Sequence, residues 1–155
     1  LCNDILQEVR YPKYQNVRLL DNVEQDLFTY RFADITNHQD LDFWQKFEHS
    51  VSDWRNQNYC PNKWKRAKGA VTLFNHIAED CVDVQIMAAA GGQWQMLANF
   101  YKQFTQALED KYRCDFAHLQ VCFLEFLNSP AGQRFLQGGE ANQPPLSHIL
   151  VDEYQ

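Results

Sequence analysis

The chain has 155 residues, which is enough for one domain with a buried core, because domains commonly contain about 100–150 residues. Its 45% of hydrophobic residues exclude a disordered segment, and the sequence has no apolar run of the roughly 18 residues that a membrane-spanning helix needs. The net charge of −6 excludes a protein that coats nucleic acid nonspecifically with its whole surface, so a nucleic-acid contact would need a local basic patch.

The five cysteines predict reduced thiols buried inside a cytoplasmic protein. Their number is odd and no two form a C-x-x-C pair, so neither a disulfide framework nor a metal site is indicated. The histidines are scattered without the spacing of metal ligands, which favours ordinary surface or capping roles. The cysteines are Cys2, Cys60, Cys81, Cys114 and Cys122, and the histidines are His38, His49, His76, His118 and His148.

The first third of the chain predicts three helices. It opens in helical rhythm without an initiator methionine or signal peptide, so a natural start at residue 1 is not expected, and this helix ends before Pro12. Asp21 and Glu24 have the spacing of a capping box, which predicts a helix over 21–34. A third helix over 39–56 has one broad apolar face. The expected apolar residues are Val23, Leu27, Tyr30 and Phe32 on the second helix and Leu41, Trp44, Phe47, Val51 and Trp54 on the third.

A polar loop is predicted over 56–62, and the one concentrated basic run follows it. One interpretation is a solvated helix start that happens to be basic. The other is a DNA-binding patch, in which the cations contact phosphates and the aromatic ring stacks on a base or supports the end of a duplex. Both interpretations stay open at this point. The residues of the run are Lys63, Trp64, Lys65, Arg66 and Lys68.

The rest of the chain predicts further helices. Two short ones are expected over 70–79 and 80–90, and a helix of about twenty residues starts at Gln93, after the Gly91-Gly92 break. Its aromatic stripe, with Trp94, Tyr101 and Phe104, keeps the helical period and is expected in the core. Asp115 is placed to cap a central, mostly apolar helix over 115–129. Pro130 then opens a short turn, and residues 138–145 form a surface loop.

A single strand is predicted at the end of the sequence. The apolar run Ile149-Leu150-Val151 is followed at once by Asp152 and Glu153, as in a buried strand that delivers acids to the edge of a sheet. The alternative is a strand end with two solvated acids. The predicted fold class is therefore mainly α, with about six to eight helices and one short C-terminal strand.

The ending from His148 to Gln155 resembles motif II, the Walker B element, of the UvrD/Rep/PcrA group of superfamily 1 DNA helicases. Asp115-Phe116 with Leu119 resembles the Asp-Phe-x-x-Leu element that lies about one helix upstream of motif II in these enzymes. Leu1-Cys2 and Leu19-Leu20-Asp21 resemble the stretch that follows their Thr-x-His-Ser motif. Residues of about 35–90 contain no motif that can be aligned.

The resemblance implies that residues 1–146 are the helical insertion of the first motor domain and that residues 147–155 begin the Walker B strand of an absent RecA-like sheet. It implies ATP and Mg²⁺ as cofactors, with Asp152 holding the metal, Glu153 orienting and deprotonating the attacking water, and Gln155 sensing the γ-phosphate. These residue types suit the chemistry, because Mg²⁺ prefers oxygen ligands and the water needs a positioned acceptor. The implied partners are single-stranded or forked DNA and the rest of the helicase motor, without a membrane.

The sequence departs from the family in having no G-x-x-x-x-G-K-[ST] loop, since none of its six glycines precedes a Lys-Ser or Lys-Thr pair. We therefore expect this chain alone to be inactive as an ATPase. Two alternatives remain: a free-standing helical module that binds a protein partner and ends in Asp-Glu by coincidence, and a nuclease-helicase fusion of the same superfamily.

Overall fold

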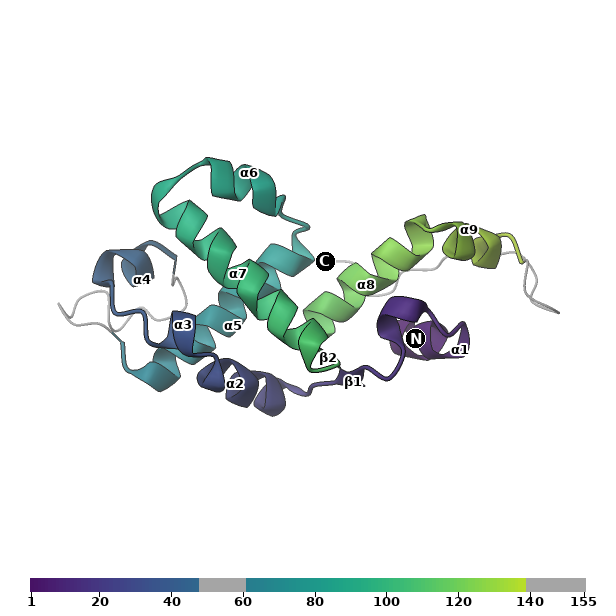
Figure 1. The fold of residues 1–155 in the computed structure, drawn as a ribbon, viewed down its shortest axis with the longest axis horizontal. Helices are drawn as coiled ribbons and strands as arrows, with labels where there is room; N and C mark the ends of the chain where they lie inside the picture. The colour runs from purple at the N-terminus through teal and green to yellow at the C-terminus, as the bar shows by residue number, and fades with distance from the viewer. Residues whose placement is uncertain (48–60, 139–155) are drawn as a thin grey trace, which may run out of the picture. The chain divides into compact units, whose positions relative to one another are not determined.

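The computed structural model describes residues 1–47 and 61–138, and this part of the chain is mainly helical. It contains nine α-helices, one 3-10 turn and a pair of two-residue strands (Figure 1), which confirms the predicted mainly α class. The chain divides into two compact units. Among the described residues, one unit consists of 1–15 and 121–138, and the other consists of 16–47 and 61–120.

The first unit is built around α1 (Cys2–Glu8), the 3-10 turn η1 (Pro12–Tyr14), the second half of α8 (Phe116–Asn128) and α9 (Pro130–Leu136). Its buried side chains include Leu6, Tyr14 and Phe126. The rings of Tyr11 and Phe126 meet edge to face at 5.4 Å, and Lys13 pairs with a glutamate of α8 at 2.7 Å. The predicted end of the first helix before Pro12 is confirmed.

The turn between α8 and α9 depends on a close backbone approach. Ser129 caps α9 by accepting a hydrogen bond from the N–H of Gly132. A Cβ at Gly132 would lie 2.0 Å from the carbonyl oxygen of Phe126, so only glycine fits there without a backbone shift. The predicted turn at Pro130 is thus a short helix whose packing requires this glycine.

In the second unit, α2 (Asn22–Arg31) begins with the predicted capping box: Asp21 accepts from the Glu24 N–H, and the Glu24 carboxylate accepts from the Asp21 N–H. The helix ends sooner than predicted, because Phe32 is extended, and α3 (Ala33–Thr36) follows. Gln25 and Thr29 are buried, whereas the three exposed large apolar residues of α2 are Val23, Leu27 and Tyr30.

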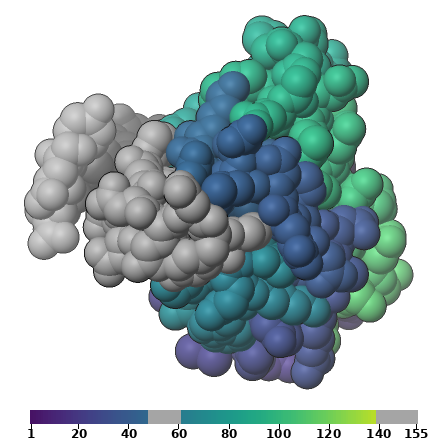
Figure 2. Space-filling view, turned by 90° about the vertical axis from the view of Figure 1, so that its left-hand side faces the viewer, coloured from purple at the N-terminus to yellow at the C-terminus, as the bar shows by residue number. Residues whose placement is uncertain are grey.

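The main core of this unit lies among α3, α4 (Leu41–Phe47), α5 (Lys63–Glu79), α6 (Val84–Ala89) and α7 (Gly92–Asp110). Helix α6 folds back onto α7 (Figure 1), and residues 33–47 lie between α5 and the α6–α7 pair on the face in Figure 2. The core side chains are Leu20, Ile35, Phe43, Trp44, Phe47, Ala70, Phe74, Ile77, Met87, Leu97, Ala98, Tyr101, Phe104 and Leu108.

Most of the predicted aromatic stripe is buried, as expected for Trp44, Phe47, Tyr101 and Phe104. Trp94 is the exception: it is 41% exposed and packs only against the edge of the core, with its ring 4.7 Å from that of Phe47. Trp94 lies in the first turn of α7, and helical periodicity alone does not show how deeply each residue of a stripe is buried. Trp54 lies outside the described residues.

Two strands were missed by the sequence analysis. Strands β1 (Arg18–Leu19) and β2 (Arg113–Cys114) pair in parallel, with Leu20 donating its N–H to the Cys114 carbonyl at 2.7 Å. Two residues are too few to produce an alternating pattern, and the partners lie far apart in the sequence. The pair holds the start of α2 beside the start of α8, which matters for the site below.

Other predictions have mixed outcomes. Of the four cysteines in the described residues, only Cys114 is buried and Cys81 is exposed, so the expectation of buried thiols is wrong for most of them. No helix in the described ranges is long and apolar enough to cross a membrane. The predicted strand over 147–155, the boundary at residue 146 and the second half of the helix over 39–56 lie outside the described residues.

Candidate nucleic-acid interface

The basic run lies in the first turns of α5, earlier than the predicted helix start at 70. Asn62 caps this helix by accepting a hydrogen bond from the Lys65 N–H at 2.9 Å. Lys65 and Lys68 are exposed, and Trp64 is 40% exposed. The run is therefore a helical surface, and its side chains are displayed at helical spacing.

Aromatic rings and cations alternate on this surface. The Trp64 ring lies 5.4 Å from the ring of Tyr30 on α2, and the Lys63 ammonium lies 4.7 Å from the centre of the Tyr30 ring. The Lys68 ammonium lies 5.8 Å from the Trp64 ring and 3.8 Å from the carboxylate of Asp26. We call Lys63, Trp64, Lys65, Lys68 and Tyr30 the α5 patch. Cation–aromatic contacts of this kind hold both partners at the surface without hiding either.

The position of the cations at a helix start is electrostatically unfavourable in isolation. The N-terminal end of a helix carries a partial positive charge, which disfavours lysine in the first turn. The same dipole adds to the lysines in attracting an anion such as phosphate. The α5 patch thus combines a positive helix start with exposed aromatic rings.

Arg66 does not share the surface with its neighbours. It is 8% exposed, and its guanidinium donates to the Thr36 carbonyl at 2.7 Å and to the Pro61 carbonyl. These bonds tie the end of α3 to the start of α5. The structure thus buries Arg66 at the joint between α3 and α5, and its predicted role as a DNA contact stays a prediction.

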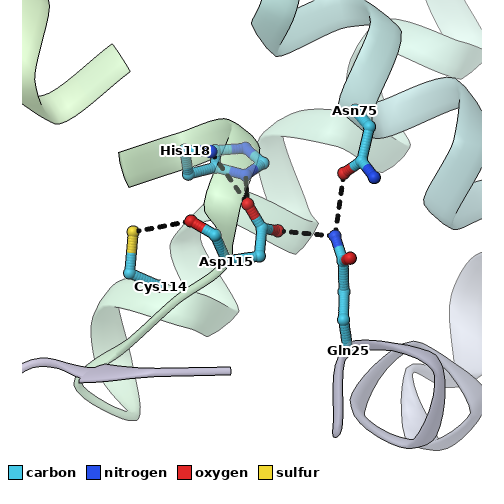
Figure 3. Close-up of polar contacts among 5 residues, drawn as sticks. All are labelled: Gln25, Asn75, Cys114, Asp115 and His118. Atoms are coloured by element: carbon cyan, nitrogen blue, oxygen red, sulfur yellow. Dashed lines mark hydrogen bonds and ion pairs between the residues drawn. The ribbon is translucent and has the colours of Figure 1, made fainter. Parts of the chain in front are cut away.

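A buried polar network lies at the start of α8, behind the strand pair. The Asp115 carboxylate accepts from the His118 N–H at 2.8 Å, which confirms the predicted helix cap. Its other oxygen accepts from the Gln25 side chain at 2.8 Å, and the same Gln25 nitrogen donates to Asn75 of α5 at 2.8 Å (Figure 3). We call Gln25, Asn75, Asp115 and His118 the Asp115 network. The Asp115 carboxylate joins α2 to the start of α8, and Gln25 extends the link to α5.

The ring of His118 completes this network. Its Nδ1 lies 2.7 Å from the Asp115 carboxylate (Figure 3), and the ring stacks on Tyr101 with 5.5 Å between the centres. Burial, with the negative charge of Asp115 adding to it, raises the pKa of Tyr101 to about 12, so this phenol stays neutral. The arrangement holds a carboxylate and an imidazole rigidly but exposes neither, which indicates a structural role.

The comparisons with known proteins give one match. The family model of the UvrD/REP helicase N-terminal domain matches residues 1–155, the whole chain. The chain belongs to the UvrD/Rep helicase family. A search of curated proteins and a search of solved structures returned no match. The family is ATP-dependent and has DNA as its substrate, and its members use Mg²⁺.

The residues that motif II of this UvrD/Rep chain assigns to Mg²⁺, water and phosphate are at its C-terminal end. Asp152, Glu153 and Gln155 lie outside the described residues, so their roles in holding Mg²⁺, activating water and sensing phosphate stay predictions. Within residues 1–47 and 61–138, no three His, Cys, Asp or Glu side chains gather into a group that could hold a metal ion. The candidate functional features in the part of the chain that the structure describes are therefore the α5 patch at the surface and the buried Asp115 network that supports the helices.

Sequence reasoning missed Tyr30, Gln25, Asn75 and the pairing role of His118. Asp115 and His118 are three residues apart at a helix start. This i, i+3 spacing places the two side chains next to each other, so the contact between them could have been predicted from the sequence. Tyr30 carried no such local signal, because its contact with Trp64 joins two helices that the sequence places 34 positions apart.

Proposed function

We propose that this chain is part of an ATP-dependent DNA helicase motor, in which ATP hydrolysis drives translocation along DNA and unwinding, and that the α5 patch contacts the DNA. Membership of the UvrD/Rep family across residues 1–155 supports the first part. The observation that carries the second part is the interleaving of Lys63, Lys65 and Lys68 with the rings of Trp64 and Tyr30. Such surfaces bind phosphates by charge and bases by stacking.

The proposed roles of the C-terminal residues come from the family motif. Asp152 holds Mg²⁺, which neutralises phosphate charge when it is bound with ATP, Glu153 orients and deprotonates the attacking water, and Gln155 senses the γ-phosphate. A DNA substrate fits the cytoplasmic location predicted from the sequence. The rival, a free-standing interaction module, is less favoured because a coincidental Asp-Glu ending does not account for a family match that includes it.

The α5 patch is tested by DNA binding of the purified 155-residue chain, measured by fluorescence anisotropy with single-stranded and forked DNA over a range of salt. We expect weak binding that falls as salt rises. Lys63→Ala with Lys65→Ala should lower the affinity at low salt by about tenfold and reduce the log–log salt slope by about two, because two phosphate contacts are lost. Trp64→Ala should lower the affinity with little change in slope, since stacking releases no counterions.

The matched control is Lys102→Ala with Arg134→Ala, which removes the same charge from exposed positions of α7 and α9. If this control weakens DNA binding as much as the patch variant does, the binding reflects net charge and the α5 patch is not an interface. Circular dichroism of each variant verifies that the helices are intact.

We also propose that the chain by itself does not hydrolyse ATP, because its sequence contains no Gly-Lys-Ser/Thr phosphate loop. Phosphate release by the purified chain, with ATP, Mg²⁺ and single-stranded DNA, should equal the rate of a Glu153→Gln control prepared in parallel. Turnover that is above this control would contradict the proposal, since it would require a phosphate-binding site elsewhere in these residues.

A further inference from the structure

A groove of about 530 Å³ lies between α2 and the C-terminal end of α7, inside the unit of residues 16–120. We call it the α2–α7 groove. Its volume is within the range of about 300–1,000 Å³ that is usual for sites that bind small molecules or side chains of a partner. The lining residues are Leu20, Glu24, Leu27, Phe28, Arg31, Phe32, Ala107 and Lys111.

The floor of the groove is apolar because α2 buries polar side chains while part of its apolar surface faces outward. Gln25 and Thr29 of this helix are buried, and Gln25 is fixed there by the Asp115 network. Leu27, which lines the groove, is 44% exposed, and Val23, one turn before it, is 66% exposed, whereas Phe28 is partly buried against the core. The exposed surface of Val23 and Leu27 is therefore left for a partner to cover.

The rim of the groove carries a net positive charge. The one acidic lining residue, Glu24, is neutralised by an ion pair with Arg18 and also accepts the Asp21 N–H. Arg31 and Lys111 are both exposed, and neither forms an ion pair within the part of the chain that the structure describes. The occupant best suited to this rim brings negative charge.

We propose that the α2–α7 groove is a docking site for an acidic protein segment that inserts bulky apolar side chains between α2 and α7 and pairs its carboxylates with Arg31 and Lys111. Charge complementarity selects the acidic partner, and the apolar floor selects apolar side chains. A nucleic acid is the less suitable occupant, because the two rings that line the groove, Phe28 and Phe32, are partly buried and pack edge to face against Phe104 instead of presenting a free stacking surface to a base.

The test uses the purified 155-residue chain and a fluorescein-labelled peptide with the repeat Glu-Leu-Leu-Glu-Glu-Phe. We expect saturable binding that Lys111→Glu weakens about tenfold, since a rim ion pair is replaced by repulsion. Leu27→Asp should weaken binding at least as much, and it is safe for folding because Leu27 is partly exposed. The matched control is Lys102→Glu, the same charge change at an exposed position of α7 outside the groove, and it should leave the affinity within twofold.

Several results would overturn this docking site. One is the absence of saturable binding, and another is equal binding of a peptide that has lysine in place of glutamate. A third is an equal loss of peptide affinity in Lys102→Glu and Lys111→Glu. The last is displacement of the peptide by single-stranded DNA together with loss of DNA binding in Lys111→Glu. The last result would assign the groove to nucleic acid. Because Lys63→Ala with Lys65→Ala leaves the groove intact, unchanged peptide binding in that variant separates this proposal from the fate of the α5 patch.

Discussion

Replacing Asp115 with alanine should lower the free energy of unfolding of the chain by about 3–5 kcal/mol, the cost of removing one partner from a buried, charged network. The carboxylate is 1% exposed and accepts hydrogen bonds from the His118 backbone and from the Gln25 side chain, while the His118 ring also faces it. In the alanine variant these buried donors lose their acceptor, and each costs about 1–3 kcal/mol if no water replaces it. Urea unfolding followed by circular dichroism measures the change.

The controls separate the parts of this effect. Asp21→Ala removes an equivalent helix cap from an exposed position and should cost about 1 kcal/mol, the ordinary value for a cap. Asp115→Asn keeps the cap but turns a donor toward Gln25, so its effect should lie between the two. A cost for Asp115→Ala no larger than that for Asp21→Ala would mean that the network contributes nothing beyond the cap.

The elements that the sequence predicted best are those with local signals. The Asp21–Glu24 capping box, the Asp115 cap and the stop before Pro12 each depend on residues within one or two turns, and all three lie where they were expected. The same applies to the core aromatics Trp44 and Phe104, which keep the helical period. Local chemistry thus sets where helices begin and end, and the structure adds how they are oriented.

The orientation of the helices is what the sequence did not reveal. The sequence showed Val23 and Leu27 as apolar residues of the helix, but α2 buries Gln25 and Thr29, because Gln25 has partners on α5 and at the start of α8 that make its burial favourable. Those partners are 50 and 90 positions away, so no window of sequence reveals them. The strand pair at Leu19 was missed for the same reason.

In the α5 patch, too, some residues were identified from local sequence and others became evident only from helix packing. Lys63 and Lys65 were identified by composition alone, since a basic run in an acidic chain is conspicuous. Composition could not distinguish Arg66 from them. Successive side chains on a helix point in different directions, so Arg66 is buried while its neighbour Lys65 is exposed. Nor could composition supply Tyr30, whose ring reaches Trp64 only after α2 and α5 pack together.

Replacing Arg66 with methionine should lower the free energy of unfolding by about 2–4 kcal/mol while changing DNA affinity less than twofold. Methionine keeps the apolar stem but leaves the carbonyls of Thr36 and Pro61 without the charged donors that now satisfy them. Arg66→Lys should recover only part of the loss, because an ammonium cannot reproduce the fork of the guanidinium. Thermal or urea unfolding gives the stability, and anisotropy at a temperature where the variant is folded gives the affinity.

A second readout reports on Arg66 independently of stability. Burial lowers the pKa of His38; the charge of Asp40 opposes this and the positive charge of Arg66 adds to it. Removing the guanidinium therefore removes one cause of the lowering, and the pKa of His38, followed by NMR, should rise in Arg66→Met. If the folded variant instead binds DNA as poorly as Lys63→Ala with Lys65→Ala, Arg66 is a direct contact. A positioning residue should move the stability and the pKa of His38 but not the salt slope of binding, because it never faces the phosphates.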